Sequence, residues 1–530
     1  MSVWYNAAMP NRASQQQSYA DLQTAFLASE NKVESLERQL AWFKKQMFGP
    51  KSERRLADDN PDQLLLNGLL GEAVKANPVE TETITYERGK AKKQRGSDCV
   101  TDSGLRFDEN VPVEVIELEA PELTDSDADQ YEVIGMKSLH RLAQRPASFV
   151  VLRFDQPVVK RKGSNDITTT AAPAGVFDQS LADVSFLAGM LVDKFMYHLP
   201  LYRQHQRLQQ AGITLSRATL TNLSKRSIEL LRPIVEANLR GILQSKVLAM
   251  DETPIKASRS GKGKMKTGWF WPVYGDQDEI VFTYANTRAR AHIEEVLAEH
   301  FSGTLVSDGY IAYARFTEAR DDVVHAQCWV HSRRQFIEAE STEPDHVAVA
   351  LQFIRELYAV ETDLTAKGLK SDKKQSWRIN HCKPIVDAFF AWCEQALLDE
   401  ALLPDNPLIK AIGYVLKRQC ELRVFLEDAD VPLDTNHLER ALRPIPMGRK
   451  NWNFCWTEIG AEHVGIIQSL ICTCKLQGVD PYTYLVDVLQ RVGVHPANDV
   501  ASLTPRLWKE KFAASPMRSE LHLAVNNGLE

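Results

Sequence analysis

Apolar residues recur at alternating steps of four and three from residue 22 to residue 47. The positions are Leu22, Phe26, Ser29, Val33, Leu36, Leu40, Phe43 and Met47, with Ser29 as the one polar member. This heptad spacing is typical of a helix that packs an apolar stripe against another helix. The repeat is short and ends at Gly49-Pro50, which stops a helix. We expect either a self-associating coiled coil or a single amphipathic helix packed on the rest of the chain.

A different pattern begins at residue 106. Polar and apolar residues alternate between residues 106 and 165, as in VPVEVIEL and SFVVLRF, which predicts a small β module. The stretch before it, residues 56–105, mixes Pro, Gly, Asn and charged residues and is typical of a linker.

The next region has helical periodicity with one interruption. The string LYRQHQRLQQAGITLSRATLTNL predicts a helix, a break near Gly212, and a second helix that Thr214 or Ser216 would cap. This is the outline of a helix-turn-helix, whose second helix would present Arg217 and Thr219 to DNA. Two ordinary helices of an α domain would give the same pattern, so both alternatives stay open.

Short buried strands follow. KVLAMD, GWFWPVYG, EIVFTYA and GTLVSDGY are typical of strands, and VVHAQCWVHSRRQF of a strand that runs into a helix. The resulting order, β-β-β-α-β-α-β-α, predicts an α/β domain. From residue 344 onward the apolar positions keep one helical face, most clearly at Ile385, Phe389, Trp392 and Ala396. We expect an all-helical insertion there, after which the chain returns to the α/β core.

Composition limits the class of protein. The chain has 44% hydrophobic and 25% charged residues, and no apolar run approaches the roughly 18 residues that a membrane span needs. The N-terminus, MSVWYNAAMPNRASQQQ, lacks the basic and apolar regions of a secretory signal. The eight cysteines of the chain are scattered, as expected for reduced thiols in a cytoplasm. We expect a cytoplasmic protein without a membrane partner.

The net charge of −7 is unevenly distributed. Acidic residues dominate between Asp108 and Glu132, whereas basic residues gather in three clusters, a distribution that permits contact with a polyanion. The third cluster is spaced by glycines and predicts a flexible basic loop beside Asp251. The clusters are Lys44, Lys45, Lys51, Arg54 and Arg55; Arg88, Lys90, Lys92, Lys93 and Arg95; and Lys256, Arg259, Lys262, Lys264 and Lys266.

Three carboxylates are candidates for metal chemistry. Asp251 and Asp308 each follow a hydrophobic strand, and Glu439 begins a helix, so all three can meet at one edge of a sheet. Mg²⁺ or Mn²⁺ takes hard oxygen ligands, and two such ions about 3.5–4 Å apart can act on a phosphodiester. Glu252 is the rival of Asp251. Because adjacent strand residues point to opposite faces, we expect only one of the pair, Asp251, in the site.

Glu439 has a second interpretation. Asn436 followed by Glu439 three residues later is typical of a capping box that opens a short helix, which Pro444 would close. Arg443 would then be the surface salt-bridge partner of Glu439.

Several strings, taken in series, carry a family resemblance. They are VLAMDETPIK, SDGYIAYARF, CWVHSRRQF, NHLERALRPIPMGRKNWNF and SLICTCKLQGVDPYTYLVDVL, together with LERQLAWFKKQMFGPKSERRL and HLPLYRQHQRL. From about residue 22 to residue 492 the chain resembles the transposases of the insertion sequence 66 family, which are DDE transposases with a ribonuclease-H-like catalytic fold. The resemblance implies that Asp251, Asp308 and Glu439 form the catalytic and metal-binding triad, with the helical insertion between the last two.

The resemblance also implies partners and a reaction. The partners are DNA, as element ends and as target, and accessory proteins from neighbouring reading frames. The heptad repeat adds a second copy of the chain in a homo-oligomer, which we expect to be a dimer. The reaction is metal-dependent strand cleavage and strand transfer at the bacterial nucleoid. A DNA-binding regulator, or a related nuclease without transposition activity, is the alternative. The candidate DNA contacts are Arg217, Thr219, Lys262, Lys264, Lys266, Arg333, Arg334, Arg440, Arg443, Arg449, Lys450 and Trp452.

One departure from the family concerns zinc. Members usually carry Cys-x-x-Cys pairs in a zinc module before the helix-turn-helix, and the corresponding β module has no cysteine here, so we expect no zinc. Cys328 and His331 have the spacing of two zinc ligands, but they form only half of a tetrahedral site. We expect this pair to serve in packing or in support of the edge of the active site.

These patterns predict an α/β ribonuclease-H-like catalytic domain with an all-helical insertion. A coiled-coil helix, a small β module and a helical, helix-turn-helix-like DNA-binding region precede it. The expected segments are the coiled coil (1–55), linker (56–105), β module (106–175), DNA-binding helices (176–245), catalytic core (246–343), insertion (344–432), second part of the core (433–495) and C-terminal tail (496–530).

Overall fold

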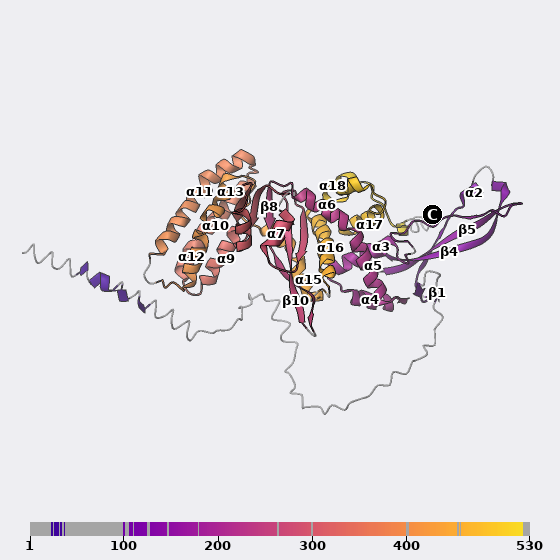
Figure 1. Cartoon of the computed structure of the whole chain (residues 1–530), viewed down its shortest axis with the longest axis horizontal. Helices are drawn as coiled ribbons and strands as arrows, with labels where there is room; N and C mark the ends of the chain where they lie inside the picture. Colours follow the sequence, from indigo (N-terminus) through magenta and orange to yellow (C-terminus); the bar gives the residue numbers. More distant parts are fainter. Residues whose placement is uncertain are drawn as a thin grey trace, which may run out of the picture.

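A computed structural model describes most of the chain from residue 105 onward (Figure 1). The described residues are 23–24, 26–30, 32–33, 36–37, 99–100, 105–109, 111–124, 128–145, 148–178, 180–261, 264–297, 300–398, 402–452, 455 and 457–522. Of the heptad positions, Phe26, Val33 and Leu36 are helical and more than half exposed. Leu22, Leu40, Phe43 and Met47 lie outside the described residues, so the coiled coil stays a prediction.

A six-stranded sheet occupies the centre of the molecule (Figure 1). Its strand order is β11-β10-β8-β12-β13, with β9 paired to β10. β12 runs parallel to both β8 and β13, whereas β10 is antiparallel to its neighbours. The strands are β8 (Val247–Met250), β9 (Thr253–Gly261), β10 (Lys264–Tyr274), β11 (Ile280–Ala285), β12 (Gly303–Ser307) and β13 (Val323–Gln327).

Strand β9 was not predicted. The structure pairs β9 with β10 in an antiparallel hairpin, so the expected flexible basic loop is wrong for the described residues. Ile255 and Ala257 are buried, whereas Lys256 is exposed. This alternation fixes the face of the strand, and the register of the hairpin shifts on both sides of Met265.

Helices cover both faces of the central sheet. Phe270 lies against Gly465 of α16, whereas the adjacent Trp271 contacts His292 of α7 and Tyr313 of α8. Because neighbouring strand residues point to opposite faces, α16 lies on one side and α7 and α8 on the other. The helices are α7 (Arg290–Leu297), α8 (Ile311–Thr317), α14 (Asn436–Leu442), α15 (Pro444–Trp452) and α16 (Glu458–Leu476).

A bundle of helices extends from β13 at one end of the molecule (Figure 1). Its aromatic core centres on Phe389, whose ring contacts Trp329, Phe336 and Phe353. The all-helical character predicted for this stretch is confirmed. The bundle consists of α9 (Trp329–Ala339), α10 (Pro344–Ala366), α11 (Ser371–Ala396), α12 (Pro407–Leu416) and α13 (Gln419–Glu427).

The opposite end carries a long hairpin of β4 and β5 (Figure 1), so the predicted β structure is present. A second, small sheet has the order β1-β2-β7, and its first strand lies inside the stretch interpreted as a linker. The elements are β1 (Cys99–Val100), β2 (Arg106–Phe107), β3 (Val113–Glu117), α2 (Pro121–Thr124), η2 (Ala128–Gln130), β4 (Tyr131–Arg145), β5 (Ser148–Arg161), β6 (Ile167–Thr169) and β7 (Ile213–Thr214).

Four helices lie between the β module and the central sheet: α3 (Val184–Phe195), α4 (Leu201–Gln210), α5 (Arg217–Leu230) and α6 (Arg232–Ile242). The predicted break is confirmed, since Gly212 has φ +80° and a Cβ there would overlap the carboxylate of Asp108. Ser216 caps α5 by accepting a hydrogen bond of 3.0 Å from the backbone N–H of Thr219.

The residues expected to form a C-terminal tail, 496–530, are folded over their described part, which ends at residue 522. They contain η3 (Ala497–Leu503) and α18 (Pro505–Lys511), and α17 (Pro481–Arg491) precedes them. Trp508 is 2% exposed and packs edge-on against Tyr484. Within the described part of the chain, no helix is long and apolar enough to cross a membrane.

Candidate active site

Two aspartates meet because their strands are parallel neighbours. Asp251 follows β8 and Asp308 follows β12, and the register pairs Ala249 with Val306. Continuing this register by two residues places the aspartates side by side at one edge of the sheet. Carboxyl ends of parallel strands are a common position for active sites in α/β proteins.

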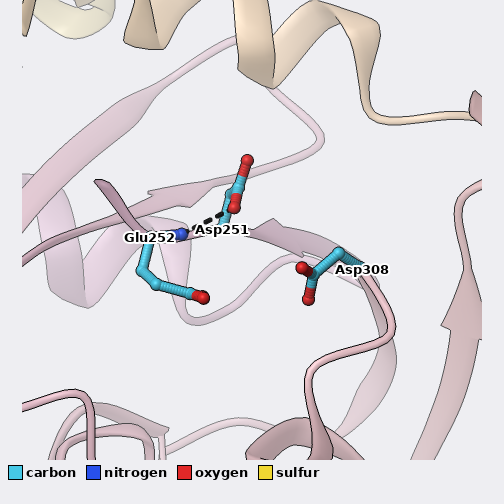
Figure 2. Close-up of side chains that lie close together, drawn as sticks. All are labelled: Asp251, Glu252 and Asp308. Carbon is cyan, nitrogen blue, oxygen red and sulfur yellow. Dashed lines mark hydrogen bonds between the residues drawn. The ribbon is translucent and has the colours of Figure 1, made fainter. Parts of the chain in front are cut away.

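Glu252 joins the aspartates. One carboxylate oxygen from each of Asp251, Glu252 and Asp308 lies within 4.8 Å of the other two (Figure 2). The expectation that only Asp251 enters the site is therefore wrong. Residues 251 and 252 lie between β8 and β9, where the alternation of strand side chains does not apply.

The Glu252 carboxylate is already held by two donors. Arg288 Nε donates a hydrogen bond of 2.7 Å to Oε1, and the Tyr313 hydroxyl donates one of 2.8 Å to Oε2. The side chain is 1% exposed. Burial, followed by the charge of Asp308, raises the pKa of Glu252. These contacts leave Asp251 and Asp308 with more uncommitted oxygen atoms than Glu252.

Asp251 has the most perturbed ionisation in the cluster. Burial, with smaller contributions from Glu252, Asp308 and Glu439, raises its pKa to about 7, although its carboxylate accepts a backbone hydrogen bond from Glu252. That bond is 2.7 Å long and ends on Oδ1. Asp308 Oδ1 accepts one of 2.9 Å from the backbone of Tyr310, which fixes its rotamer. A cation would relieve the repulsion among these carboxylates.

Glu439 faces the same cleft from α14. Its Oε1 is buried without a hydrogen-bond partner among the described residues, and it lies 3.8 Å from both His331 Nε2 and Arg334. The predicted salt bridge to Arg443 is not among the ion pairs of the described residues. Glu439 also lies outside the 4.8 Å cluster of Asp251.

The capping-box interpretation of Glu439 is wrong. Helix α14 begins at Asn436, and its N-cap is Thr435, whose side chain makes no capping hydrogen bond. The N–H of Asn436 donates instead to Asp434 Oδ1 at 2.9 Å. The backbone N–H of Asn436, which a capping box would pair with Glu439, therefore does not donate to the Glu439 carboxylate.

Cys328 and His331 support this edge, as predicted. The thiol of Cys328 accepts a hydrogen bond of 3.3 Å from the N–H of Thr435, and the N–H of Trp329 donates to Leu433. Both contacts join the end of β13 to the start of α14. His331 adds a direct contact to Glu439 that the spacing alone did not reveal, because it depends on how α9 and α14 meet.

These groups line a cleft of about 360 Å³. Burial and Arg334 lower the pKa of His331, against the attraction of Asp308 and Glu439. Both acidic and basic side chains line the cleft. The lining consists of Asp251, Glu252, Arg288, Asp308, His331, Arg334, Glu439, Leu442, Arg443 and Pro446.

Comparison with known proteins assigns this arrangement to a family. The model of the IS66 transposase family matches residues 179–463, and that of the IS66 C-terminal element matches residues 469–506. The chain belongs to the IS66 transposase family. A third model, described as transposase C of IS166 homeodomain, matches residues 35–116, so a segment similar to a homeodomain precedes the region that the IS66 family model matches.

Two relatives from Sinorhizobium fredii (strain NBRC 101917 / NGR234) are similar over most of their length. The IS66 chain is 30% identical to "uncharacterized protein y4jD" over 399 residues, which cover 70% of this chain and 77% of the relative. It is 27% identical to "uncharacterized protein y4hP" over 523 residues, or 93% and 90%.

The candidate DNA contacts of this IS66 protein occupy different environments. Exposed side chains belong to Arg217, Lys264, Lys266, Arg333, Arg334, Arg440 and Arg443. Thr219 is half-buried, with its hydroxyl 2.9 Å from Ser216 Oγ, and Arg449 donates to the carbonyl of Pro254. Thr219 and Arg449 therefore make contacts within the protein itself. Lys262 and the side chains of Lys450 and Trp452 lie outside the description.

Proposed function

We propose that this protein is a DDE transposase. It binds the ends of its insertion sequence, hydrolyses one strand to expose a 3′ hydroxyl, and joins that hydroxyl to target DNA. The observation that carries the proposal is the convergence of Asp251 and Asp308 from parallel strands on a cleft that also contains Glu439, whose Oε1 accepts no hydrogen bond from the described residues.

The strand order supports a ribonuclease-H-like core. Three successive strands, β9 excluded, are antiparallel to one another, and two further strands are added in parallel on the other side of β8. The chain leaves this core after α9 and returns at α14. The helical insertion therefore separates Asp308 from Glu439 in sequence but not in space.

The residues of the cleft fit a hard divalent cation. Carboxylate oxygens are the ligands that Mg²⁺ and Mn²⁺ prefer, and a cation could bind Glu439 Oε1, which is buried and accepts no hydrogen bond from the described residues. Asp251, Asp308 and Glu439 would hold two such ions, while Glu252 stays with Arg288 and Tyr313. When bound, these ions activate the attacking oxygen and stabilise the leaving oxygen of a phosphodiester.

The chain positions the DNA around this centre. Arg334 and Arg443 are exposed at the rim of the cleft, where guanidinium groups can pair with backbone phosphates. Arg217 at the start of α5 is exposed and would contact the element ends from the helix-turn-helix-like pair. The N-terminal heptad repeat would pair two copies so that two ends are held together at the bacterial nucleoid in the cytoplasm, with accessory proteins joining the assembly.

Isosteric substitutions test the proposal. Asp251→Asn, Asp308→Asn and Glu439→Gln each remove one negative ligand oxygen, so each should abolish nicking and strand transfer of a labelled element end in Mg²⁺. DNA binding should persist, and partial cleavage in Mn²⁺ is expected because this ion is less demanding about geometry. A DNA-binding regulator would show no metal-dependent nicking in the parent, and a plain nuclease would nick without joining strands.

A further inference from the structure

A second cavity adjoins the acidic cleft. Its volume is about 590 Å³, and residues of β10, α14, α15 and α16 line it. Arg443 lines both cavities, so the acidic cleft and the second cavity share this guanidinium. This volume lies in the range of small-ligand sites.

The second cavity carries an excess of positive charge. Arg440, Arg443 and Lys475 line it and are exposed, and none of them is in an ion pair within the described part of the chain. Asp278 also lines the cavity, but its carboxylate accepts a hydrogen bond of 2.7 Å from the Tyr274 hydroxyl. Three cations around one hollow favour an anionic ligand.

Flat rings line the same cavity. The rings of Tyr274 and His437 lie 4.7 Å apart at 69°. Burial, with the charge of Lys475, lowers the pKa of His198. The Nδ1 atom of His198 is buried without a hydrogen-bond partner among the described residues. Rings of this kind can stack on a nucleobase, and an open ring nitrogen can bind its edge.

We propose that this cavity holds one nucleotide of an unpaired DNA strand beside the point of cleavage. Arg440 and Lys475 bind the phosphate, and Tyr274 and His437 contact the base. A paired base is stacked inside the duplex and cannot enter the cavity, so the site selects single-stranded DNA. The inference rests on the proposed function, because it places the nucleotide on the strand that the acidic cleft cuts.

The test is the double variant Arg440→Gln/Lys475→Gln. Arg443 is left unchanged because it also lines the acidic cleft. Binding of a fluorescent single-stranded oligonucleotide is measured by anisotropy over a range of salt concentrations, without divalent ions. Each lost phosphate contact should reduce the logarithmic salt slope by about 0.7. Binding to blunt duplex DNA should stay at the parent level.

The matched control removes two charges elsewhere. Lys370→Gln/Lys417→Gln changes two exposed lysines that line neither cavity, and it should bind single strands like the parent. An equal loss in the control, or an equal loss for duplex DNA, would reduce the effect to overall charge and overturn the proposal. Competition by inorganic phosphate as effective as that by a deoxynucleoside monophosphate would overturn the base contact.

Photocrosslinking locates the base directly. A single strand that contains a halogenated uracil should crosslink to the peptide of Tyr274 or His437, and crosslinks confined to other peptides would contradict the site. Nicking is scored separately on the parent protein. If the parent binds single strands through this cavity but never nicks DNA, the proposed function fails and the nucleotide site stands. If the parent nicks and the double variant binds single strands normally, only the nucleotide site fails.

Discussion

Arg418 donates a hydrogen bond of 3.0 Å to the backbone carbonyl of Gly309, the residue that follows Asp308. The same guanidinium lies 4.0 Å from the ring centroid of Tyr414, and a Cβ at Gly309 would overlap the Tyr414 side chain. The helical insertion therefore packs against the turn that carries Asp308, one of the candidate metal ligands. In addition to separating Asp308 from Glu439 along the chain, it contacts the candidate site.

The contact between Arg418 and Gly309 predicts a loss of cleavage at a distance from the carboxylates. Arg418→Met removes the hydrogen bond but keeps much of the side-chain volume, so the Asp308 turn should shift. Displacement of a catalytic group by about 1 Å can cost on the order of a hundredfold in rate, and we expect a fall of roughly tenfold to a hundredfold in nicking. DNA affinity should not change. Lys417→Met is the control, and a parent-like rate in Arg418→Met would show that the turn holds without the insertion.

Substitution of Glu252 distinguishes a residue that supports the site from one that binds the metal. Glu252→Gln keeps an oxygen that can accept from Arg288 and removes a carboxylate whose pKa is raised, so the free energy of unfolding of the metal-free protein should not fall at about pH 8. Urea denaturation measures this free energy. Mg²⁺ binding by isothermal calorimetry should change little, because the Glu252 oxygens already have donors. Unchanged stability with lost Mg²⁺ binding would make Glu252 a ligand instead.

The β9–β10 hairpin predicts a salt-dependent contact with DNA. Lys264 and Lys266 are exposed on β10, whereas Lys256 is engaged by a hydrogen bond of 2.7 Å to Thr267. Lys264→Gln/Lys266→Gln should reduce the logarithmic salt slope of duplex binding by up to about 1.8, or about 0.9 for each phosphate contact. An unaltered slope would place both lysines in solvent. Lys256→Gln should lower the free energy of unfolding and leave the salt slope of duplex binding nearly unchanged.

The strands that end in Asp251 and Asp308 could be predicted from the sequence because each is a short apolar run that stops at a carboxylate. The pairing of β8 with β12 is not a local property, yet the α/β pattern restricts such strands to one sheet. Strand β9 was missed because Ser and Gly follow its buried positions, Ile255 and Ala257, and only its pairing with β10 continues the strand.

Other features depend on contacts between distant segments. The proximity of His331 to Glu439 follows from the meeting of α9 and α14, and Glu252 turns toward Asp308 because Arg288 and Tyr313 hold it there. Trp508 is buried by Tyr484 of another helix. The periodicity of the short helix around Trp508 does not predict this packing, because two or three apolar residues are too few to define a face.

Asp251 predicts an opposition between stability and metal binding. Its pKa of about 7 in the folded chain lies above the ordinary value of 3.8, so its favourable contribution to stability is present below about pH 4 and is lost as pH rises through about 7. Asparagine cannot ionise, so Asp251→Asn avoids the fall in stability that ionisation of the carboxyl causes. The metal-free variant should therefore melt at least roughly 2–4 °C above the parent at about pH 8, and the difference should be smaller at about pH 5. Mg²⁺ should raise the melting temperature of the parent above pH 7 and leave the variant unchanged, because only the ionised carboxylate binds the ion. Asp276→Asn, an exposed aspartate outside the cleft, serves as the control. A variant that melts below the parent at both pH values would show that the carboxylate stabilises the empty site.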